Sequence, residues 1–135
     1  MDVYCISEFK DQFDKLKKKK SYHTLEKEII DYFFDKETEE LRTGTNLNQS
    51  NTTPYIKKRI CGSGGYRVYY LLVIIKDNVY LAYVHPKTGS LGESNLPNSL
   101  IKHLQNRMLE SIRDNRLFLL TLSESKTHII FTKVI

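Results

Sequence analysis

The chain has 135 residues, 40% hydrophobic and 27% charged, which is long enough to bury a core without disulfides or a structural metal. No apolar run approaches the roughly 20 residues of a membrane span, and no secretory signal is evident. We therefore expect one cytoplasmic domain with no membrane partner. The formal charge of +5 is unevenly spread, because residues 55–87 hold six Lys/Arg and only one acidic residue, Asp77. This local excess favours a polyanionic partner.

The first third of the chain predicts a short strand and two helices. Residues 3–6 are β-prone, and apolar residues then recur at helical spacing at Phe9, Phe13 and Leu16. Ser21 is a plausible N-cap for a second amphipathic helix running to Phe33. The two helices predict an αα-hairpin. The polar composition of residues 35–54 indicates an exposed connection.

The remainder predicts an antiparallel sheet with one more helix. Residues 55–60, 66–75 and 79–85 are candidate strands, joined by short turns at 62–65 and 76–78. Pro97 suits a helix start, and the apolar pattern from Leu100 to Ile112 continues that helix. Residues 116–122 and 127–135 predict a final β-hairpin.

Together these elements predict an α+β fold in a single domain. We expect a small curled antiparallel sheet, with the N-terminal helical hairpin and the third helix packed on one of its faces. The division that we expect is a core of residues 1–116 and a C-terminal hairpin extension of residues 117–135.

The alternation of side chains along the predicted strands gathers charges and aromatic rings on one face. Lys57 and Arg59 share a face of the first strand, and Arg67 shares one with Tyr69 on the second. On the third strand Tyr83 and His85 are predicted to share a face with Leu81. Cations interleaved with aromatic rings suit phosphates and unstacked bases. The ordinary alternative is the solvated face of a small sheet.

Other chemistries find little support in the sequence. The glycines at 62, 64 and 65 join two strands and lack a phosphate-loop motif. His23, His103 and His128 do not have metal-ligand spacing. The segment 55–87 offers no paired carboxylates for a two-metal nuclease or a glycosidase. No cofactor and no metal are therefore expected.

The stretch from Tyr55 to Lys87, with the predicted helical hairpin of residues 9–34 before it, resembles the RelE/HigB-like toxins of bacterial toxin–antitoxin pairs, and the resemblance covers about residues 2–110. The resemblance lies in a basic strand, the segment Gly64-Gly65-Tyr66-Arg67-Val68-Tyr69-Tyr70, and a third strand ending in an aromatic residue and Lys87. It implies an endoribonuclease that cuts mRNA on the ribosome without metal, using the ribose 2′-OH, and that a cognate antitoxin protein inhibits. The long connection at 35–54 and the hairpin at 117–135 depart from the family pattern.

The resemblance assigns roles to the residues of the basic face. Lys57, Arg59 and Arg67 match the phosphate-stabilising cations. His85 matches the acid/base position, with Lys87 assisting, because imidazole titrates near neutral pH. RNA contacts are assigned to Lys58, Tyr69, Tyr70 and Tyr83. Two alternatives stay open, namely a ParE-like toxin that poisons DNA gyrase and a non-enzymatic RNA-binding module on the same fold.

Overall fold

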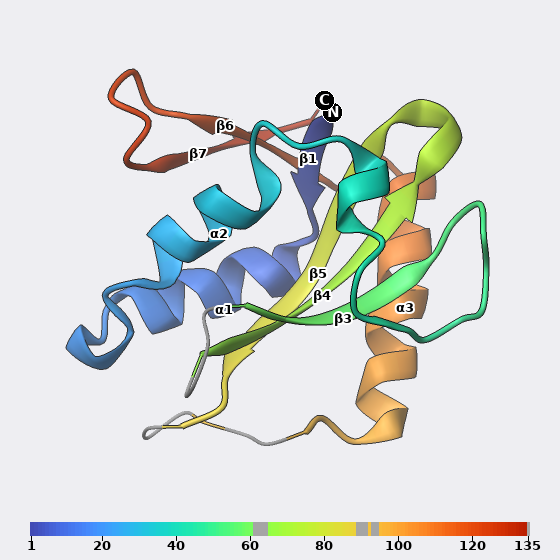
Figure 1. The fold of residues 1–135 in the computed structure, drawn as a ribbon, viewed down its shortest axis with the longest axis horizontal. Coiled ribbons are helices and arrows are strands. Elements are labelled where there is room, and N and C mark those ends of the chain that lie inside the picture. The colour runs from blue at the N-terminus through green and yellow to red at the C-terminus, as the bar shows by residue number, and fades with distance from the viewer. Residues whose placement is uncertain (61–64, 89–91, 93–94, 135) are drawn as a thin grey trace.

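A computed structural model describes residues 1–60, 65–88, 92 and 95–134 (Figure 1). The α-helices in these residues are α1 (Ser7–Lys17), α2 (Leu25–Phe33) and α3 (Asn98–Arg113). The strands are β1 (Asp2–Cys5), β2 (Thr45–Asn46), β3 (Tyr55–Ile60), β4 (Tyr66–Val73), β5 (Asn78–Pro86), β6 (Phe118–Leu122) and β7 (Ile129–Lys133). The predicted α+β class is confirmed. The predicted turn at 62–65 lies largely outside the described residues.

All the strands form one open, mixed sheet in the order β2-β3-β4-β5-β1-β6-β7. The predicted meander is present, since β4 pairs antiparallel with both β3 and β5. The expectation of a purely antiparallel sheet is wrong at one place, where β1 pairs parallel with β5. The chain passes from β1 to β5 through two α-helices and three strands, and parallel pairing requires a long connection of this kind.

Helices cover both faces of the sheet, so the prediction that all of them share one face is wrong. Figure 1 shows α1 and α2 on the left of the central strands, the side that we call the front, and α3 on their right, the rear. The front core contains residues such as Phe9, Ile29 and Tyr70, and the rear core joins Leu104 and Met108 of α3 to Tyr69. The run from Tyr66 to Leu72 is apolar on both faces of β4 apart from Arg67, which is the pattern of a strand covered on both sides.

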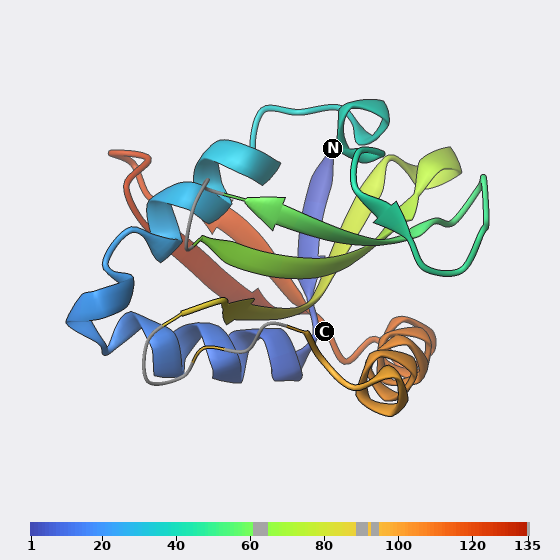
Figure 2. The same cartoon turned by 60° about the horizontal axis from the view of Figure 1, so that its bottom comes forward.

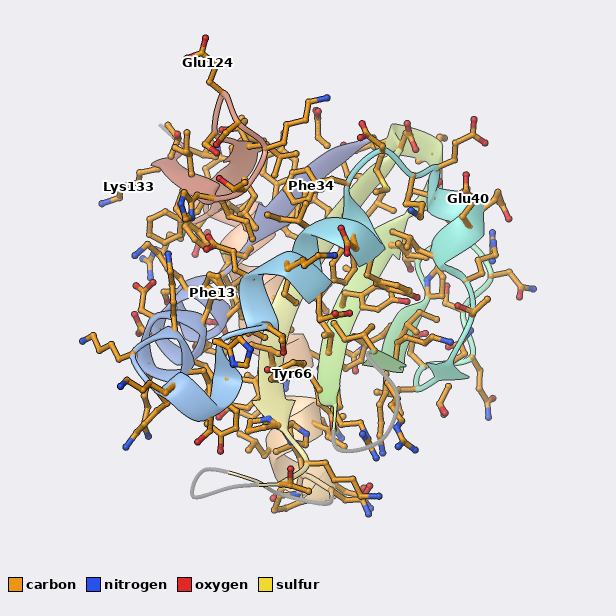
Figure 3. The ribbon with its side chains drawn as sticks, turned by 60° about the vertical axis from the view of Figure 1, so that its left-hand side comes forward. Phe13, Phe34, Glu40, Tyr66, Glu124 and Lys133 are labelled. Atoms are coloured by element: carbon orange, nitrogen blue, oxygen red, sulfur yellow. The ribbon has the colours of Figure 1, made fainter. Side chains whose placement is uncertain are left out.

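The two N-terminal helices form close to their predicted positions. Phe9, Phe13 and Leu16 are buried under α1, and Leu25, Ile29 and Phe33 under α2. Figure 3 shows α2 lying across the strands, with the labelled Phe13 on the neighbouring helix and Tyr66 near the lower end of the sheet. The predicted cap at Ser21 is displaced, because residues 20–22 form a 3-10 turn and α2 begins at Leu25.

The connection at 35–54 is more ordered than a polar, exposed loop. Residues 38–41 form a 3-10 turn that buries Thr38 and Leu41, and the Leu41 carbonyl accepts a 2.8 Å hydrogen bond from the Tyr70 hydroxyl. Strand β2 then pairs with β3. Gly44 has a φ of +106°, and a Cβ there would lie 2.7 Å from the Lys57 carbonyl oxygen, so a glycine is required at this close approach.

The C-terminal hairpin is built into the sheet and the core. Strand β6 pairs with β1, which places Leu120 opposite Val3. Leu120 and Ile129 are buried in the same core as Phe9. The hairpin is also attached to α2, because the Glu26 carboxylate accepts hydrogen bonds from the Ile129 N–H at 2.9 Å and from His128 Nδ1 at 3.1 Å, and lies 3.3 Å from Lys17 Nζ.

The attachment through Glu26 predicts a pH-dependent contribution to stability. Partial burial raises the pKa of the Glu26 carboxyl, but the bonds from Ile129, His128 and Lys17 outweigh burial and leave the pKa below its ordinary value. A group with a lowered folded-state pKa stabilises the protein above its unfolded pKa and loses that effect as the pH falls through the folded pKa. Glu26→Gln should therefore cost about 1–3 kcal/mol in urea unfolding near neutral pH, and the difference should shrink on acidification below about pH 4.

The matched control for this prediction is Glu124→Gln, on the exposed tip of the same hairpin. This change should leave stability within about 0.5 kcal/mol of the parent protein. An effect of Glu26→Gln that stayed constant from neutral to acidic pH would contradict the role given to the ionised carboxylate.

Candidate nucleic-acid interface

Two cross-strand rows define a cationic face near one end of the meander. Arg59 of β3 lies opposite Arg67 of β4, which lies opposite His85 of β5. The next row on this face places Lys57 opposite Tyr69 and Tyr69 opposite Tyr83. Directly opposed residues have Cβ atoms about 4.5–5.5 Å apart. The six side chains therefore form one contiguous cluster, which we call the cationic face, on the side of the sheet covered further along by α3.

A β-bulge at Ala82 is what brings β5 into this arrangement. Tyr70 pairs with Leu81 and Tyr69 with Tyr83, so Ala82 is the extra residue. Leu81 consequently points into the front core, while Ala82 and Tyr83 belong to the rear core. The predicted sharing of a face by Leu81, Tyr83 and His85 is thus wrong for Leu81. An unbroken strand would have placed Tyr83 and His85 on the opposite face from Arg67.

Arg67 is the cation whose surroundings most suggest an anionic ligand. Its Nη1 atom is buried and has no hydrogen-bond partner among the described residues. Arg67 also lies opposite Arg59 in the register, and like charges directly opposed across strands are destabilising. Burying an unsatisfied charged donor costs free energy. A phosphate bound at this position would offset both costs.

Two lysines, Lys57 and Lys87, add positive charge at this end of the meander. Lys57 Nζ donates a 3.0 Å hydrogen bond to Asn95 Oδ1. No local sequence pattern predicts this partner. Lys87 is exposed, and its backbone N–H bonds to the Gly65 carbonyl at 3.1 Å, which holds it at the end of the β4–β5 ladder. Within the described parts of the chain, neither of these lysines nor Arg67 forms an ion pair with an acidic residue.

His85 lies beneath the cations and has little contact with solvent. It is only 1% exposed, and its ring stacks on that of Tyr69 at 5.8 Å. Nδ1 is 3.2 Å from the Pro86 carbonyl oxygen and Nε2 is 3.4 Å from the Tyr69 hydroxyl. Since a carbonyl can only accept, the contact with Pro86 requires a proton on Nδ1. The imidazole is therefore held between the Pro86 carbonyl and the Tyr69 hydroxyl.

Two residues assigned to RNA contacts lie on the other side of the sheet. Lys58 pairs with Val68 and lines a small hollow with Glu28 and Asp31 of α2. Tyr70 is fully buried against Phe33, and its hydroxyl bonds to the Leu41 carbonyl. Neither residue contributes to the cationic face. Tyr69 belongs to that face but is itself buried, which leaves Tyr83 as the partly exposed ring.

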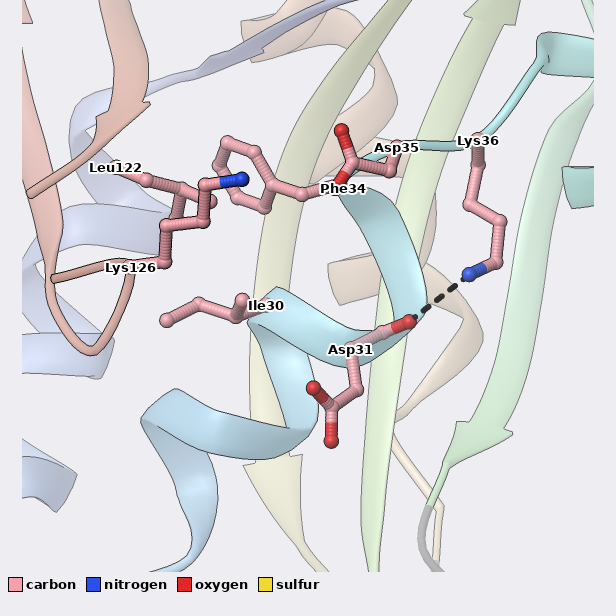
Figure 4. Close-up of a pocket in the computed structure, with 7 residues that line it drawn as sticks. All are labelled: Ile30, Asp31, Phe34, Asp35, Lys36, Leu122 and Lys126. Carbon is pink, nitrogen blue, oxygen red and sulfur yellow. Dashed lines mark hydrogen bonds between the residues drawn. The ribbon is translucent and has the colours of Figure 1, made fainter. Parts of the chain in front are cut away.

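A sizeable cavity in the described residues lies elsewhere in the fold. It measures about 430 Å³ and lies between α2 and the β6–β7 hairpin, lined by Ile30, Phe34 and Leu122 with charged residues at its rim (Figure 4). One of these, Lys36, donates to the Asp31 carbonyl at 3.2 Å. The charged residues that line it are of mixed sign and the lining includes no histidine, serine or cysteine, so the cationic face remains our candidate site.

Among the residues that the structure describes, no group of three or more His, Cys, Asp or Glu side chains is arranged to hold a metal ion. None of the described helices is long and apolar enough to cross a membrane.

Comparisons with known proteins add no family assignment. No protein-family model, curated protein or solved structure matches this chain. The resemblance to RelE/HigB-like toxins therefore stays a prediction from the sequence of residues 55–87.

Proposed function

We propose that the cationic face binds single-stranded RNA and that the protein is a metal-independent endoribonuclease of the RelE/HigB-like toxin type. The observation that carries the proposal is the placement of Lys57, Arg59 and Arg67 beside the Tyr83 ring, with Arg67 Nη1 buried and unbonded. Cations that follow a backbone next to a ring that can stack on a base are the usual means of binding single-stranded RNA.

The proposed reaction is an attack of the ribose 2′-oxygen on the adjacent phosphorus. A 2′-O–P bond forms and the P–O5′ bond breaks, giving a 2′,3′-cyclic phosphate and a free 5′-hydroxyl. One proton leaves the 2′-hydroxyl and another reaches the departing 5′-oxygen. Arg59 and Arg67 stabilise the charge that develops on the phosphoryl oxygens, and the exposed Lys87 is our candidate for proton transfer.

The structure changes the role that we propose for His85. Because it is buried and bonded to Tyr69, we propose that it positions the aromatic layer under Arg67 and does not itself exchange protons with RNA. His85→Gln should then lower the cleavage rate by less than about tenfold and leave the shape of the pH–rate profile unchanged. A loss of about 10²–10⁴-fold together with the loss of one limb of that profile would instead make it the acid/base residue.

A second candidate function is favoured by the same burial of His85. A sheet face that presents cations and one ring, with its imidazole covered, is also suited to an RNA-binding module without cleavage. Such a module would bind single-stranded RNA and leave transcripts intact.

Expression of the protein in growing bacteria, followed by mapping of transcript 5′ ends, tests the proposal. We expect growth inhibition and new 5′ ends that lie in frame within translated messages and are absent from untranslated copies. DNA damage with intact transcripts would instead indicate gyrase poisoning. Intact transcripts and intact DNA, together with RNA binding by the purified protein, would identify the binding module.

A further inference from the structure

We infer that a second site, separate from the cationic face, binds the phosphate group of a small organic phosphate. A cavity of about 290 Å³ lies where the start of α1 and the last turns of α3 meet the ends of β6 and β7. Figure 2 shows α3 nearly end-on in orange beside the blue α1, and the ion pair between Arg107 and Glu8, 2.7 Å apart, joins the two helices. The lining includes Arg107, Ser111, Arg116, Phe118 and Lys133. None of these belongs to the cationic face, so the inference does not depend on the proposed function.

The end of α3 places Arg116 at this cavity. Asn115 takes a left-handed conformation, with a φ of 55°, and the chain turns back so that the Arg116 N–H donates to the Ser111 carbonyl at 2.8 Å. This is the pairing expected when a helix ends in a left-handed residue. Arg116 and Ser111 are thereby held side by side.

The cations at the cavity differ in how far they are already paired. Arg107 Nε lies 2.7 Å from Glu8 and its Nη1 lies 3.2 Å from Glu110, so its charge is largely neutralised. Arg116 and Lys133 are exposed and form no ion pair within the described residues. Arg116 is near enough to Asp114 to help lower the pKa of that carboxyl. Lys133 and, in part, Arg116 thus offer positive charge to an anion at the cavity.

A buried hydroxyl provides an independent indication of a polar ligand. Ser111 is 3% exposed and lines the cavity. No side-chain hydrogen bond joins it to any described residue. Unlike Arg67 Nη1, the Ser111 oxygen is not a buried atom without a partner, so solvent in the cavity can reach it. The Ser111 hydroxyl is therefore available to the oxygen of a ligand in this cavity.

The remaining walls indicate what carries the phosphate. Leu117 is buried, so one side of the cavity is apolar. The volume is near the lower limit of small-molecule pockets. These features fit a phosphate ester with a small organic body, of the size of a nucleoside monophosphate. The same chemistry could be supplied by one nucleotide of a longer RNA.

Titration with adenosine 5′-monophosphate, followed by amide chemical shifts in two-dimensional NMR, tests the inference. We expect shifts at Ser111, Arg116 and Lys133 in the parent protein. The double variant Arg116→Gln/Lys133→Gln should raise the dissociation constant about tenfold or more, and Ser111→Ala should raise it about threefold. The matched control is Arg113→Gln/Lys126→Gln, which removes the same charge outside this cavity and should change the constant less than twofold.

A parallel titration with a short single-stranded RNA separates the two sources of phosphate. In one outcome the mononucleotide fails to bind while RNA changes the amide chemical shift of Ser111. If the double variant abolishes that change, the site holds a nucleotide of RNA. Equal effects of the double variant and its control, or shifts confined to the cationic face, would overturn the inference. Arg67→Gln should leave the Ser111 shifts intact, so failure of the proposed function would be seen separately. Preserved spectral dispersion of each variant shows that it is folded.

Discussion

Arg67→Gln is expected to lower the rate of RNA cleavage by about 10²–10³-fold, because it removes a cation aimed at charge that develops in the transition state. Glutamine keeps much of the side-chain length and can still donate a hydrogen bond, so the change tests mainly the charge. The measurement is the single-turnover rate on a ribosome-bound message. Fluorescence anisotropy with a short single-stranded RNA gives the accompanying affinity. The logarithmic salt dependence of that affinity should fall by about one unit, as for the loss of one phosphate contact.

Lys58→Gln is the matched control for Arg67→Gln. Lys58 lies opposite Val68, one residue before Arg67's partner Arg59 on β3, but its side chain is on the α2 side of the sheet. It should change cleavage less than twofold and leave the salt dependence unaltered. If both variants weakened RNA binding equally, only net charge would matter, and the cationic face would not be a specific site.

Most of the cationic face could be predicted because it depends on residues close together in the sequence. The alternation along β3 and β4 fixes which side chains share a face, and short turns fix antiparallel pairing, so Lys57, Arg59 and Arg67 were grouped from the sequence. The bulge at Ala82 carries no comparable signal, since Val79 to Val84 reads as an unbroken apolar strand. It nonetheless decides the face on which Tyr83 and His85 lie.

Features that depend on contacts between distant parts of the chain are harder to predict from the sequence. The burial of His85 results from packing against Tyr69 and neighbouring segments, which no window of sequence reveals. The parallel pairing of β1 with β5 likewise joins residues some 76 positions apart. The two-sided burial of β4 did have a signal, because an apolar run that does not alternate indicates cover on both faces. The placement of α3 behind the sheet follows from that pattern.

Leu120→Ala should destabilise the whole protein by about 2–5 kcal/mol, the usual range for truncating a fully buried leucine. Leu120 is 2% exposed and lies opposite Val3, in the core that also contains Phe9 and Phe13. Urea unfolding should show one cooperative transition with a lower midpoint and an unchanged slope. The prediction depends on β6 being an internal strand, between β1 and β7.

Leu119→Ala provides the control, because the same atoms are removed one residue away on the opposite, partly exposed face of the strand. It should cost no more than about 1 kcal/mol. A large effect at Leu120 with a small one at Leu119 means that residues 117–135 fold with the rest of the chain. Equal small effects would instead support the predicted division into a core of residues 1–116 and a C-terminal hairpin extension. That division would also remove Phe118 and Lys133 as fixed walls of the second phosphate site, so this stability measurement constrains both the fold and the ligand inference.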